Sequence, residues 1–373
     1  MNFSRASIFL FLVTSLGVAV VACSDSDSGG GGTSNPTNDG GGGGTDGGGN
    51  DGNDGGGPSD ECVASGSSTD ILSGVEGPQG RAAVDDQFVY VPGKLAGGEG
   101  VQRIPRAGGA GTPLATAALQ NVVPDLALVA GSDVYFVGAS SGTIYKVPAA
   151  GGAATYTEFA TGYNMLTLRR LVADADSLYV LAYKGSSPVI DRIPLAGGSP
   201  QTVATLTNGQ YNLALQGTDV WFSGGGIADT AVRHVPKAGG TPESAVTGKQ
   251  CLNGLAVTAD TIFCADTNVL ERMPRAGGTA TPLYSTPRSE IDRVENAVVS
   301  DDGAVAYVAD AMKHPNERGG RILRIDVATG TTTALACNVQ PLEQLALGPN
   351  ALVTTGSFVG VLDDQSDVKL LGR

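Results

Sequence analysis

The chain has 373 residues with 23 basic and 37 acidic side chains, so its formal net charge at pH 7 is −14. It contains no basic stretch suited to a phosphate backbone, which argues against a nucleic-acid-binding protein. Aromatic residues make up 5% of the chain and include a single tryptophan, which argues against a surface that stacks sugars.

The first element in chain order is an export signal over residues 1–23. The short basic start MNFSR precedes the apolar run ASIFLFLVTSLGVAVVA, and Cys23 follows directly. This layout is too short and wrongly flanked for a membrane span. Its ending, VVAC, resembles a bacterial lipobox, which implies that Cys23 is lipidated and anchors the protein in the cell envelope, at the outer membrane, the cell surface or the periplasmic side. The alternative is a secreted protein with an incidental cysteine.

Residues 24–61 form a tether between the signal and the folded part. Residues 24–60 contain no aliphatic or aromatic side chain, seven Asp, and no Lys or Arg. Such a segment cannot bury enough apolar surface to offset the entropy lost on ordering. We therefore expect a disordered, flexible linker ahead of a domain that spans residues 62–373.

A Pro-x-Ala-Gly-Gly turn recurs through this domain. Its prolines are spaced by 38 to 46 residues, and the segment ILRIDVATG (322–330) adds a sixth, degenerate copy with Asp326 in the place of the proline. A fixed period in this range is the signature of a solenoid or a propeller. The five prolines are Pro105, Pro148, Pro194, Pro236 and Pro274.

Within each period the apolar residues follow the pattern of short strands separated by Gly, Asp and Ser, as in residues 126–158. The second strand appears seven times, the first six times with an aromatic residue, at residues 88–91, 134–137, 178–181, 220–223, 262–265, 306–309 and 351–355. We therefore predict an all-β fold, a seven-bladed β-propeller of four-stranded antiparallel blades, with six or eight blades as alternatives. Residues 69–75 would supply or extend the outer strand of the last blade and close the ring, or residues 366–373 would fill that place.

Two columns of residues accompany the second strand. The turn before it carries Asp86, Asp133, Asp176, Asp219, Asp260, Asp302 and finally Asn350, and we interpret these as turn residues that bond their own backbone. Its large side chains, which we expect to fill the core between blades, are Tyr90, Tyr135, Tyr179, Trp221, Phe263 and Tyr307.

A third column is basic and lies two residues before each repeat proline. We expect these side chains to lay their stems on apolar surface near the rim rather than to bind an anion together. They are Arg103, Lys146, Arg192, His234, Arg272 and Arg324.

Four cysteines remain after Cys23. An exported chain meets an oxidising compartment, so disulfides are possible, and four cysteines allow three pairings. We favour Cys251–Cys264 across one hairpin and Cys62–Cys337 between the N-terminus and a late part of the domain. Their spacing fits no zinc pattern, and the sequence predicts neither a metal site nor a cofactor.

The segments IFCADTNVLERMPRAGG (262–278) and AYVAD with ILRIDVATG (306–310 and 322–330) resemble the YWTD, NHL and TolB-like class of propeller repeats. The final Asp of YWTD has counterparts only at Asp266 and Asp310, and YWTD rings typically have six blades. The resemblance implies a propeller fold and a binding role, and it implies no particular substrate.

Candidate binding residues lie on the face opposite the Pro-x-Ala-Gly-Gly turns, where loops vary most in length. The longest such loop, residues 310–320, holds Lys313 and His314. Polar residues just before the inner strands should ring the mouth of the central channel: Asp125, Arg170, Asn212, Asn253, Asn296 and Gln344.

No catalytic constellation emerges. We therefore predict a monomeric, non-enzymatic binding or scaffolding lipoprotein with an envelope or extracellular protein or peptide partner and no nucleic acid. The alternative is a hydrolase or lyase, lactonase-like, with its site at the channel mouth.

Overall fold

The computed structural model describes residues 64, 68–76, 81–95, 98–120, 124–138, 141–164, 170–207, 210–224, 230–286, 292–312, 320–339, 343–348, 351–356 and 365–372. The chain divides into two units, Met1–Ser59 and Asp60–Arg373, and every described residue belongs to the second. The signal, Cys23 and the tether therefore lie outside the described part. All regular elements of the described residues are strands, and no helix among them is long and apolar enough to cross a membrane.

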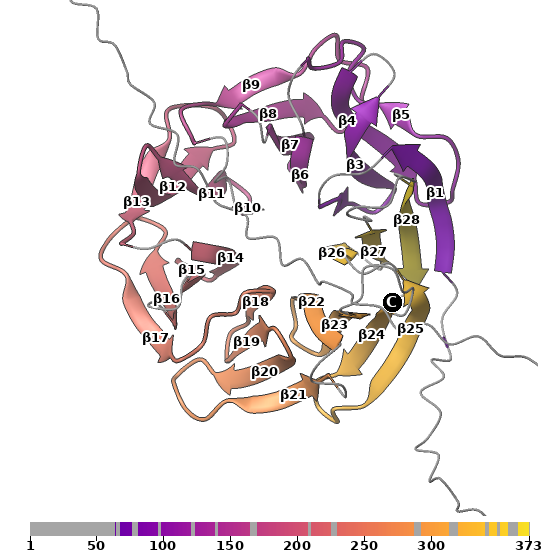
Figure 1. Cartoon of the computed structure of the whole chain (residues 1–373). Helices are drawn as coiled ribbons and strands as arrows, with labels where there is room; N and C mark the ends of the chain where they lie inside the picture. The colour runs from indigo at the N-terminus through magenta and orange to yellow at the C-terminus, as the bar shows by residue number, and fades with distance from the viewer. Residues whose placement is uncertain are drawn as a thin grey trace, which may run out of the picture. The chain divides into compact units, whose positions relative to one another are not determined.

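The strands form a ring of four-stranded antiparallel sheets around a central axis (Figure 1). Six of these sheets, which we number as blades one to six, are made of four consecutive strands each. Blades one to three comprise β2 (Ala83–Val84), β3 (Phe88–Leu95), β4 (Gly98–Pro105), β5 (Thr112–Pro113); β6 (Pro124–Ala130), β7 (Asp133–Gly138), β8 (Thr143–Pro148), β9 (Thr157–Ala160); β10 (Arg170–Ala173), β11 (Ser177–Lys184), β12 (Ser187–Pro194), β13 (Gln201–Thr205). Blades four to six comprise β14 (Gln210–Gln216), β15 (Asp219–Gly224), β16 (Ala231–Pro236), β17 (Glu243–Thr247); β18 (Gly254–Val257), β19 (Thr261–Asp266), β20 (Val269–Pro274), β21 (Thr281–Ser285); β22 (Asp292–Val299), β23 (Val305–Met312), β24 (Gly320–Asp326), β25 (Thr332–Val339).

The remaining sheet, which we call the closing sheet, joins the two ends of the described chain. Its strands are β26 (Glu343–Gly348), β27 (Ala351–Gly356), β28 (Gln365–Gly372) and β1 (Ser68–Glu76), in the spatial order β1-β28-β27-β26. The outer strand β1 runs antiparallel to β28, and Ser68 faces Leu371 across the pair. Both segments that the sequence offered for closure are therefore used, side by side.

This arrangement corrects the prediction of a seven-bladed propeller. In the described residues the continuous four-stranded blade occurs six times, not seven, and the closing sheet takes its strands from positions almost 300 residues apart in the chain. The physical reason is the ring itself. Pairing the first strand with the last ties the ends of the chain together by hydrogen bonds, and it leaves no gap in the ring.

The Pro-x-Ala-Gly-Gly segments connect the third strand of a blade to the fourth. The repeat proline is the last residue of its strand in all five copies, and Asp326 ends β24 in the same way. In the first copy the amide of Gly108 donates to the carbonyl of Pro105 at 2.9 Å. Gly108 and Gly109 have φ of +88° and +127°, and a Cβ on either would meet no atom within 4 Å. The glycines are therefore required for their backbone angle and not for space.

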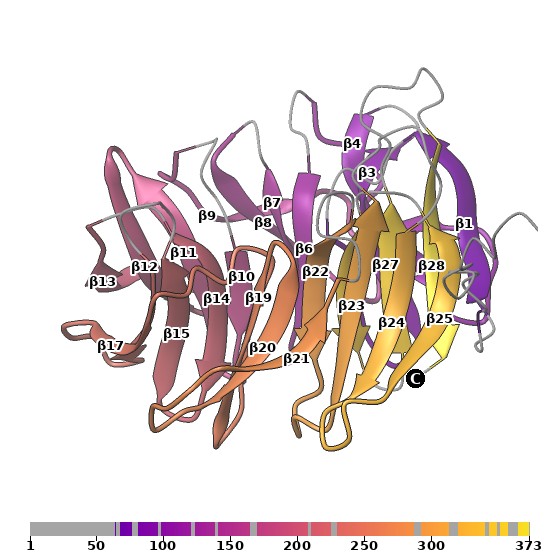
Figure 2. The ribbon, with the colours of Figure 1, turned by 60° about the horizontal axis from the view of Figure 1, so that its bottom comes forward.

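Each of these turns also bonds to the turn between the first and second strands of its own blade. The residue after the proline donates its amide to a carbonyl of that turn: Arg106 to Gln87 at 2.9 Å, and Arg275 to Asp260 at 2.7 Å. Both kinds of turn therefore lie on one face of the ring, which we call the turn face. The opposite face, where the chain crosses from blade to blade, is the crossing face (Figure 2).

The predicted column of turn aspartates is partly wrong. In blade one the carboxylate that accepts backbone N–H groups is Asp85, from Gln87 at 2.8 Å and Phe88 at 2.7 Å, rather than Asp86. In blade three it is Asp174 rather than Asp176. Both carboxylates have a second oxygen that accepts the hydroxyl proton of the core tyrosine five residues later. Asp302 does accept the amide of Ala304, at 3.0 Å, as predicted.

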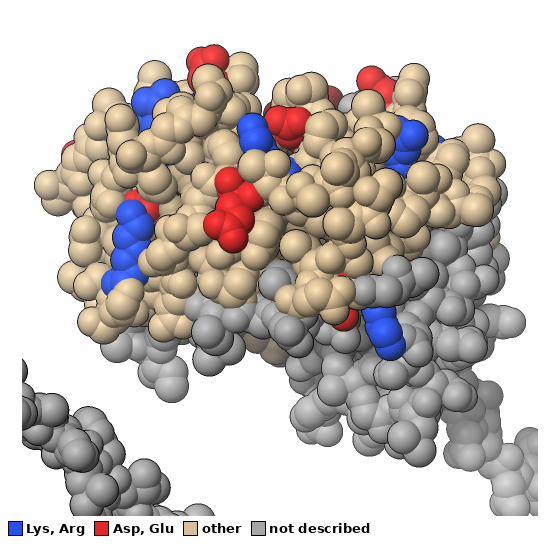
Figure 3. Space-filling view, turned by 90° about the horizontal axis from the view of Figure 1, so that it is seen from above, with Lys and Arg blue, Asp and Glu red and all other residues tan. Residues whose placement is uncertain are grey.

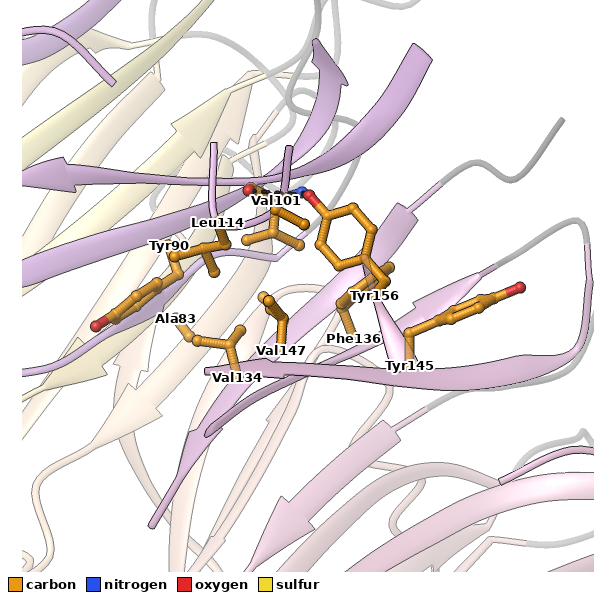
Figure 4. Packing of buried hydrophobic residues seen from close by; sticks show 11 residues of the cluster. Ala83, Tyr90, Val101, Leu114, Val134, Phe136, Tyr145, Val147 and Tyr156 are labelled. Atoms are coloured by element: carbon orange, nitrogen blue, oxygen red, sulfur yellow. Dashed lines mark hydrogen bonds between the residues drawn. The ribbon is translucent and has the colours of Figure 1, made fainter. Parts of the chain in front are cut away.

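The aromatic column fills the core between blades, as predicted. All six side chains are at most 2% exposed. Figure 4 shows the packing between blades one and two, where Tyr90 and Val101 meet Val134, Val147 and Phe136. The contact between these two blades is thus aliphatic and aromatic, and its burial stabilises the ring.

The basic column lies opposite the aromatic column on the neighbouring strand, as Tyr90 with Arg103 and Trp221 with His234 show. His234 stacks on Trp221 with ring centroids 4.6 Å apart. Arg103 donates to the carbonyl of Ala150 in the next blade, and Arg272 donates to Val327 at 2.5 Å. These basic side chains contact turn carbonyls and an aromatic ring of the propeller itself, which agrees with the expectation that the column has a structural role.

The predicted disulfide between Cys251 and Cys264 is confirmed, with Cα atoms 4.8 Å apart. Cys337 is also disulfide-bonded. Its expected partner, Cys62, lies outside the described residues.

Candidate binding site

The ring encloses a central cavity of about 590 Å³. The innermost strands of all the described sheets line it: β2, β6, β10, β14, β18, β22 and β26. Its walls are mostly aliphatic and include Leu128, Leu171, Leu213, Leu255 and Val298. The volume lies within the range of ligand sites, about 300–1,000 Å³.

Four polar or charged side chains also line the cavity: Arg81, Arg170, Asn212 and Asp301. Every inner strand runs from the crossing face to the turn face. Arg81 precedes β2, Arg170 begins β10, and Asn212 lies early in β14, so these three belong to the crossing-face mouth. Asp301 follows the end of β22 and belongs to the turn-face mouth. Among the described residues that line the cavity, the charged side chains are therefore basic at the crossing-face mouth and acidic at the turn-face mouth.

Arg170 and Asn212, both predicted from the sequence, are brought together. The Nη2 of Arg170 donates to Oδ1 of Asn212 at 2.5 Å, across the boundary between blades three and four. The amide of Asn212 donates in turn to the carbonyls of Cys251 and, at 3.1 Å, Leu252. Asn212 is 3% exposed and neutral, so it orients the guanidinium without cancelling its charge.

The strand register defines which residues are equivalent at this mouth. Each lies two residues before the inner-strand residue that pairs with the aromatic residue of the second strand. Arg81 lies two residues before Ala83, the partner of Tyr90, and Arg170 lies two residues before Val172, the partner of Tyr179. The same register includes Asn212, Asn296 and Gln344. It excludes Asp125 and Asn253, which lie one residue earlier than Leu126 and Gly254. The register of Asp125 and Asn253 therefore differs from that of the other four predicted residues.

Asn253 and Asn296 do not line the channel, contrary to the prediction. The amide of Asn253 donates to the carbonyl of Val294 in the next blade, so it joins blades five and six. Asn296 is 2% exposed, and its Oδ1 has no hydrogen-bond partner among the described residues. The side chain of Asn253 therefore reaches the adjacent blade instead of the channel.

The other predicted residues are not open to this comparison. Lys313 and His314 lie outside the described residues, and the side chains of Asp125 in β6 and Gln344 in β26 do as well. The longest crossing-face loop singled out from the sequence, residues 310–320, is thus not part of the site that we describe.

Two channel residues were missed from the sequence, Arg81 and Asp301. A signal for Arg81 exists, because blades one and three share the spacing Arg-x-x-x-Asp-x-x-x-x-Tyr at Arg81–Asp85–Tyr90 and Arg170–Asp174–Tyr179. The two Asp–Tyr hydrogen bonds match as well, at 2.6 Å and 3.1 Å. Asp301 does not follow this spacing, because the turn between the first and second strands of blade six is two residues longer than the same turn of blade one.

Charge elsewhere on the described surface is mixed. The side of the ring in Figure 3 shows blue and red side chains scattered singly among uncharged ones. Among the described residues no group of three His, Cys, Asp or Glu side chains lies close enough to hold a metal ion.

No family model and no curated protein matches the sequence. Solved structures do match, among them the virginiamycin B lyase of Staphylococcus aureus, with a TM-score of 0.59 and 12% identity over 83% of this chain and 99% of that chain. An oligogalacturonate lyase of Vibrio parahaemolyticus matches with a TM-score of 0.57 and 10% identity, over 82% of this chain and 93% of that chain. YCF48 bound to D1 peptide matches with a TM-score of 0.55 and 9% identity, over 82% and 96%.

Identities this low establish shared architecture alone. These neighbours are β-propeller proteins, and they include lyases and binding proteins. The resemblance to the YWTD, NHL and TolB-like class is thereby confirmed at the level of the fold: the chain is a β-propeller.

Proposed function

We propose that this chain is an exported, lipid-anchored binding propeller that holds a protein or peptide partner at the crossing-face mouth of its channel. The observation that carries the proposal is the guanidinium of Arg170, oriented by the buried Asn212 at the entrance of an aliphatic cavity. A concave apolar site with a few fixed polar groups is the usual form of a binding site. Loops and strand ends on a rigid scaffold are where such sites occur.

The fold does not choose between binding and catalysis, because lyases and a peptide-bound protein share it. The site supports binding through what it contains. Its charged groups are arginines at one mouth and an aspartate at the other, set in aliphatic walls. Guanidinium groups stay protonated and suit the recognition of an anionic group better than proton transfer.

The partner is tested with the full chain and envelope extract, by chemical crosslinking and recovery of the products. We compare the unmodified protein with Arg170→Gln, and with Arg106→Gln as a control on the turn face. The proposal expects one product that the unmodified chain and Arg106→Gln share and that Arg170→Gln loses while its thermal unfolding is unchanged. Equal recovery by all three chains, or turnover of an envelope substrate without a stable product, contradicts it.

The anchor has a separate experiment. The proposal expects the full chain to sediment with membranes, because two or more acyl chains on the lipidated Cys23 would anchor it stably. Cys23→Ser removes the lipidation site and should therefore leave the membrane fraction. If Cys23→Ser stays membrane-bound and is processed equally, the lipidation is wrong. Export without anchoring would be the result for an incidental cysteine.

A further inference from the structure

The channel mouth combines two features that define the chemistry of an occupant. Arg81 and Arg170 place two positive charges at the crossing-face end of the cavity, and partly exposed aliphatic side chains such as Leu128 and Leu255 line the cavity between its two mouths. An anionic group beside an apolar side chain would satisfy both. Charge complementarity of this kind steers encounter and selects partners.

The wall is also made of backbone. Each inner strand is the edge strand of its sheet, so one side of its backbone faces the channel instead of another strand. Two of these edges are partly used by contacts between blades, from Ala127 N to Arg81 O at 2.9 Å and from Ala297 N to Asn253 O at 3.1 Å. Unpaired edge groups bond a peptide backbone but offer nothing to an alkyl chain. This favours a peptide over a fatty acid.

The opposite mouth limits the direction of entry. Asp301 places a carboxylate at the turn-face end of the cavity, where it repels an acidic group. An acidic segment is therefore attracted to the crossing face alone. This is also the face on which the chain crosses between blades and on which Asn212 fixes Arg170.

We infer that the crossing-face mouth recognises a partner segment in which Asp or Glu adjoins a large aliphatic residue. The carboxylate pairs with the guanidinium groups of Arg170 and Arg81, and the aliphatic side chain enters the cavity between the leucines of the inner strands. A bidentate contact between guanidinium and carboxylate supplies orientation, and the buried aliphatic group supplies the anchor. This inference rests on the proposed binding function and names the chemistry of the partner.

The test is calorimetric titration of the full chain with four blocked peptides. The reference peptide is acetyl-Gly-Leu-Glu-Leu-Gly-amide. In one variant Gln replaces Glu, in a second Ser replaces both leucines, and in a third Lys replaces Glu. We expect the reference to bind and each replacement to weaken binding by about tenfold or more, and we expect binding of the reference to weaken with rising salt.

Protein variants give the matching half of the experiment. Arg170→Gln and Arg81→Gln should each bring the affinity for the Glu peptide down to that for the Gln peptide, while Arg106→Gln leaves the difference intact. Equal affinity for the Glu and Gln peptides overturns the inference, and so does binding of decanoate at the mouth without binding of any peptide. If the crosslinked partner still depends on Arg170 while the peptides do not discriminate, the proposed function stands and only the assigned chemistry fails.

Discussion

Tyr156 of blade two satisfies both backbone groups of Val101 in blade one. Its hydroxyl accepts the amide of Val101 at 2.9 Å and donates to the carbonyl of the same residue at 3.3 Å. Val101 is fully buried, so no water replaces these bonds. Gly100 permits the approach, because a Cβ there would lie 2.2 Å from the hydroxyl. The contact ties two blades that share no strand.

Tyr156→Phe should therefore destabilise the ring. It leaves the buried N–H of Val101 without a partner, while the carbonyl keeps the amide of Leu114 at 2.9 Å, and an unpaired buried N–H costs about 1–3 kcal/mol. Tyr145→Phe is the matched control, because its hydroxyl points away from the same cluster (Figure 4) and it should change the stability by much less. The free energy of unfolding in urea measures both, and equal values for the two variants contradict the assignment.

Gly254→Ala should strain the contact between the inner strands of blades five and six. An added Cβ would lie 2.7 Å from the backbone oxygen of Ala297 and 3.3 Å from the Cβ of Ala265. The oxygen belongs to the backbone and cannot swing aside, so we expect a loss of about 1–3 kcal/mol. The urea midpoint tests this, and a midpoint equal to that of the unmodified chain would show that the inner strands are further apart.

The Cys251–Cys264 disulfide should stabilise the fold by about 2–4 kcal/mol, because it restricts the unfolded chain over a separation of 13 residues. Replacing both cysteines by Ala removes the bond without touching Cys337. Thermal unfolding of this double variant should occur at a lower temperature than that of the unmodified chain.

The backbone at position 251 supplies a control for that experiment. Cys251 has φ of +50°, a left-handed conformation that glycine adopts more readily. Cys251→Gly combined with Cys264→Ala should therefore be more stable than the double Ala variant, by about 1 kcal/mol. The reverse order would mean that residue 251 leaves this conformation once the disulfide is gone.

Alkaline pH should unfold the ring in a defined window. Burial, followed by the charge of Asp133, raises the pKa of Tyr135 from 10.0 to about 12, and burial followed by Asp174 does the same for Tyr179. Below pH 10 both are protonated whether the chain is folded or unfolded. Between pH 10 and 12 the unfolded chain binds fewer protons, so the free energy of unfolding falls as the pH rises.

Urea unfolding at intervals from pH 9 to 12 measures this loss, and absorbance of the tyrosinate ion should rise together with unfolding. The paired change Tyr135→Phe and Tyr179→Phe should make the fall shallower. An unchanged slope would assign the alkaline transition to other groups.

Local chemistry accounts for what the sequence could predict. The Pro-x-Ala-Gly-Gly sequence combines a proline that can end a strand with glycines that can adopt positive φ, so Pro105 and Gly108 predict a turn without reference to the rest of the molecule. The large residues of the second strand lie in short continuous apolar runs such as FVYV and VYFV, which predict a strand buried on both faces. These features predicted the propeller, its core, and the face on which Arg170 and Asn212 lie.

Tertiary structure alone decided the closing sheet and the composition of the channel mouth. The pairing of β1 with β28 depends on the geometry of a whole ring, which no single repeat contains. Likewise, Asn212 and Asn253 look equivalent in the sequence, yet one orients Arg170 in the channel and the other joins two blades. Strand register and the position of the neighbouring blade make that difference, because a polar side chain bonds whichever partner the assembled ring brings within reach.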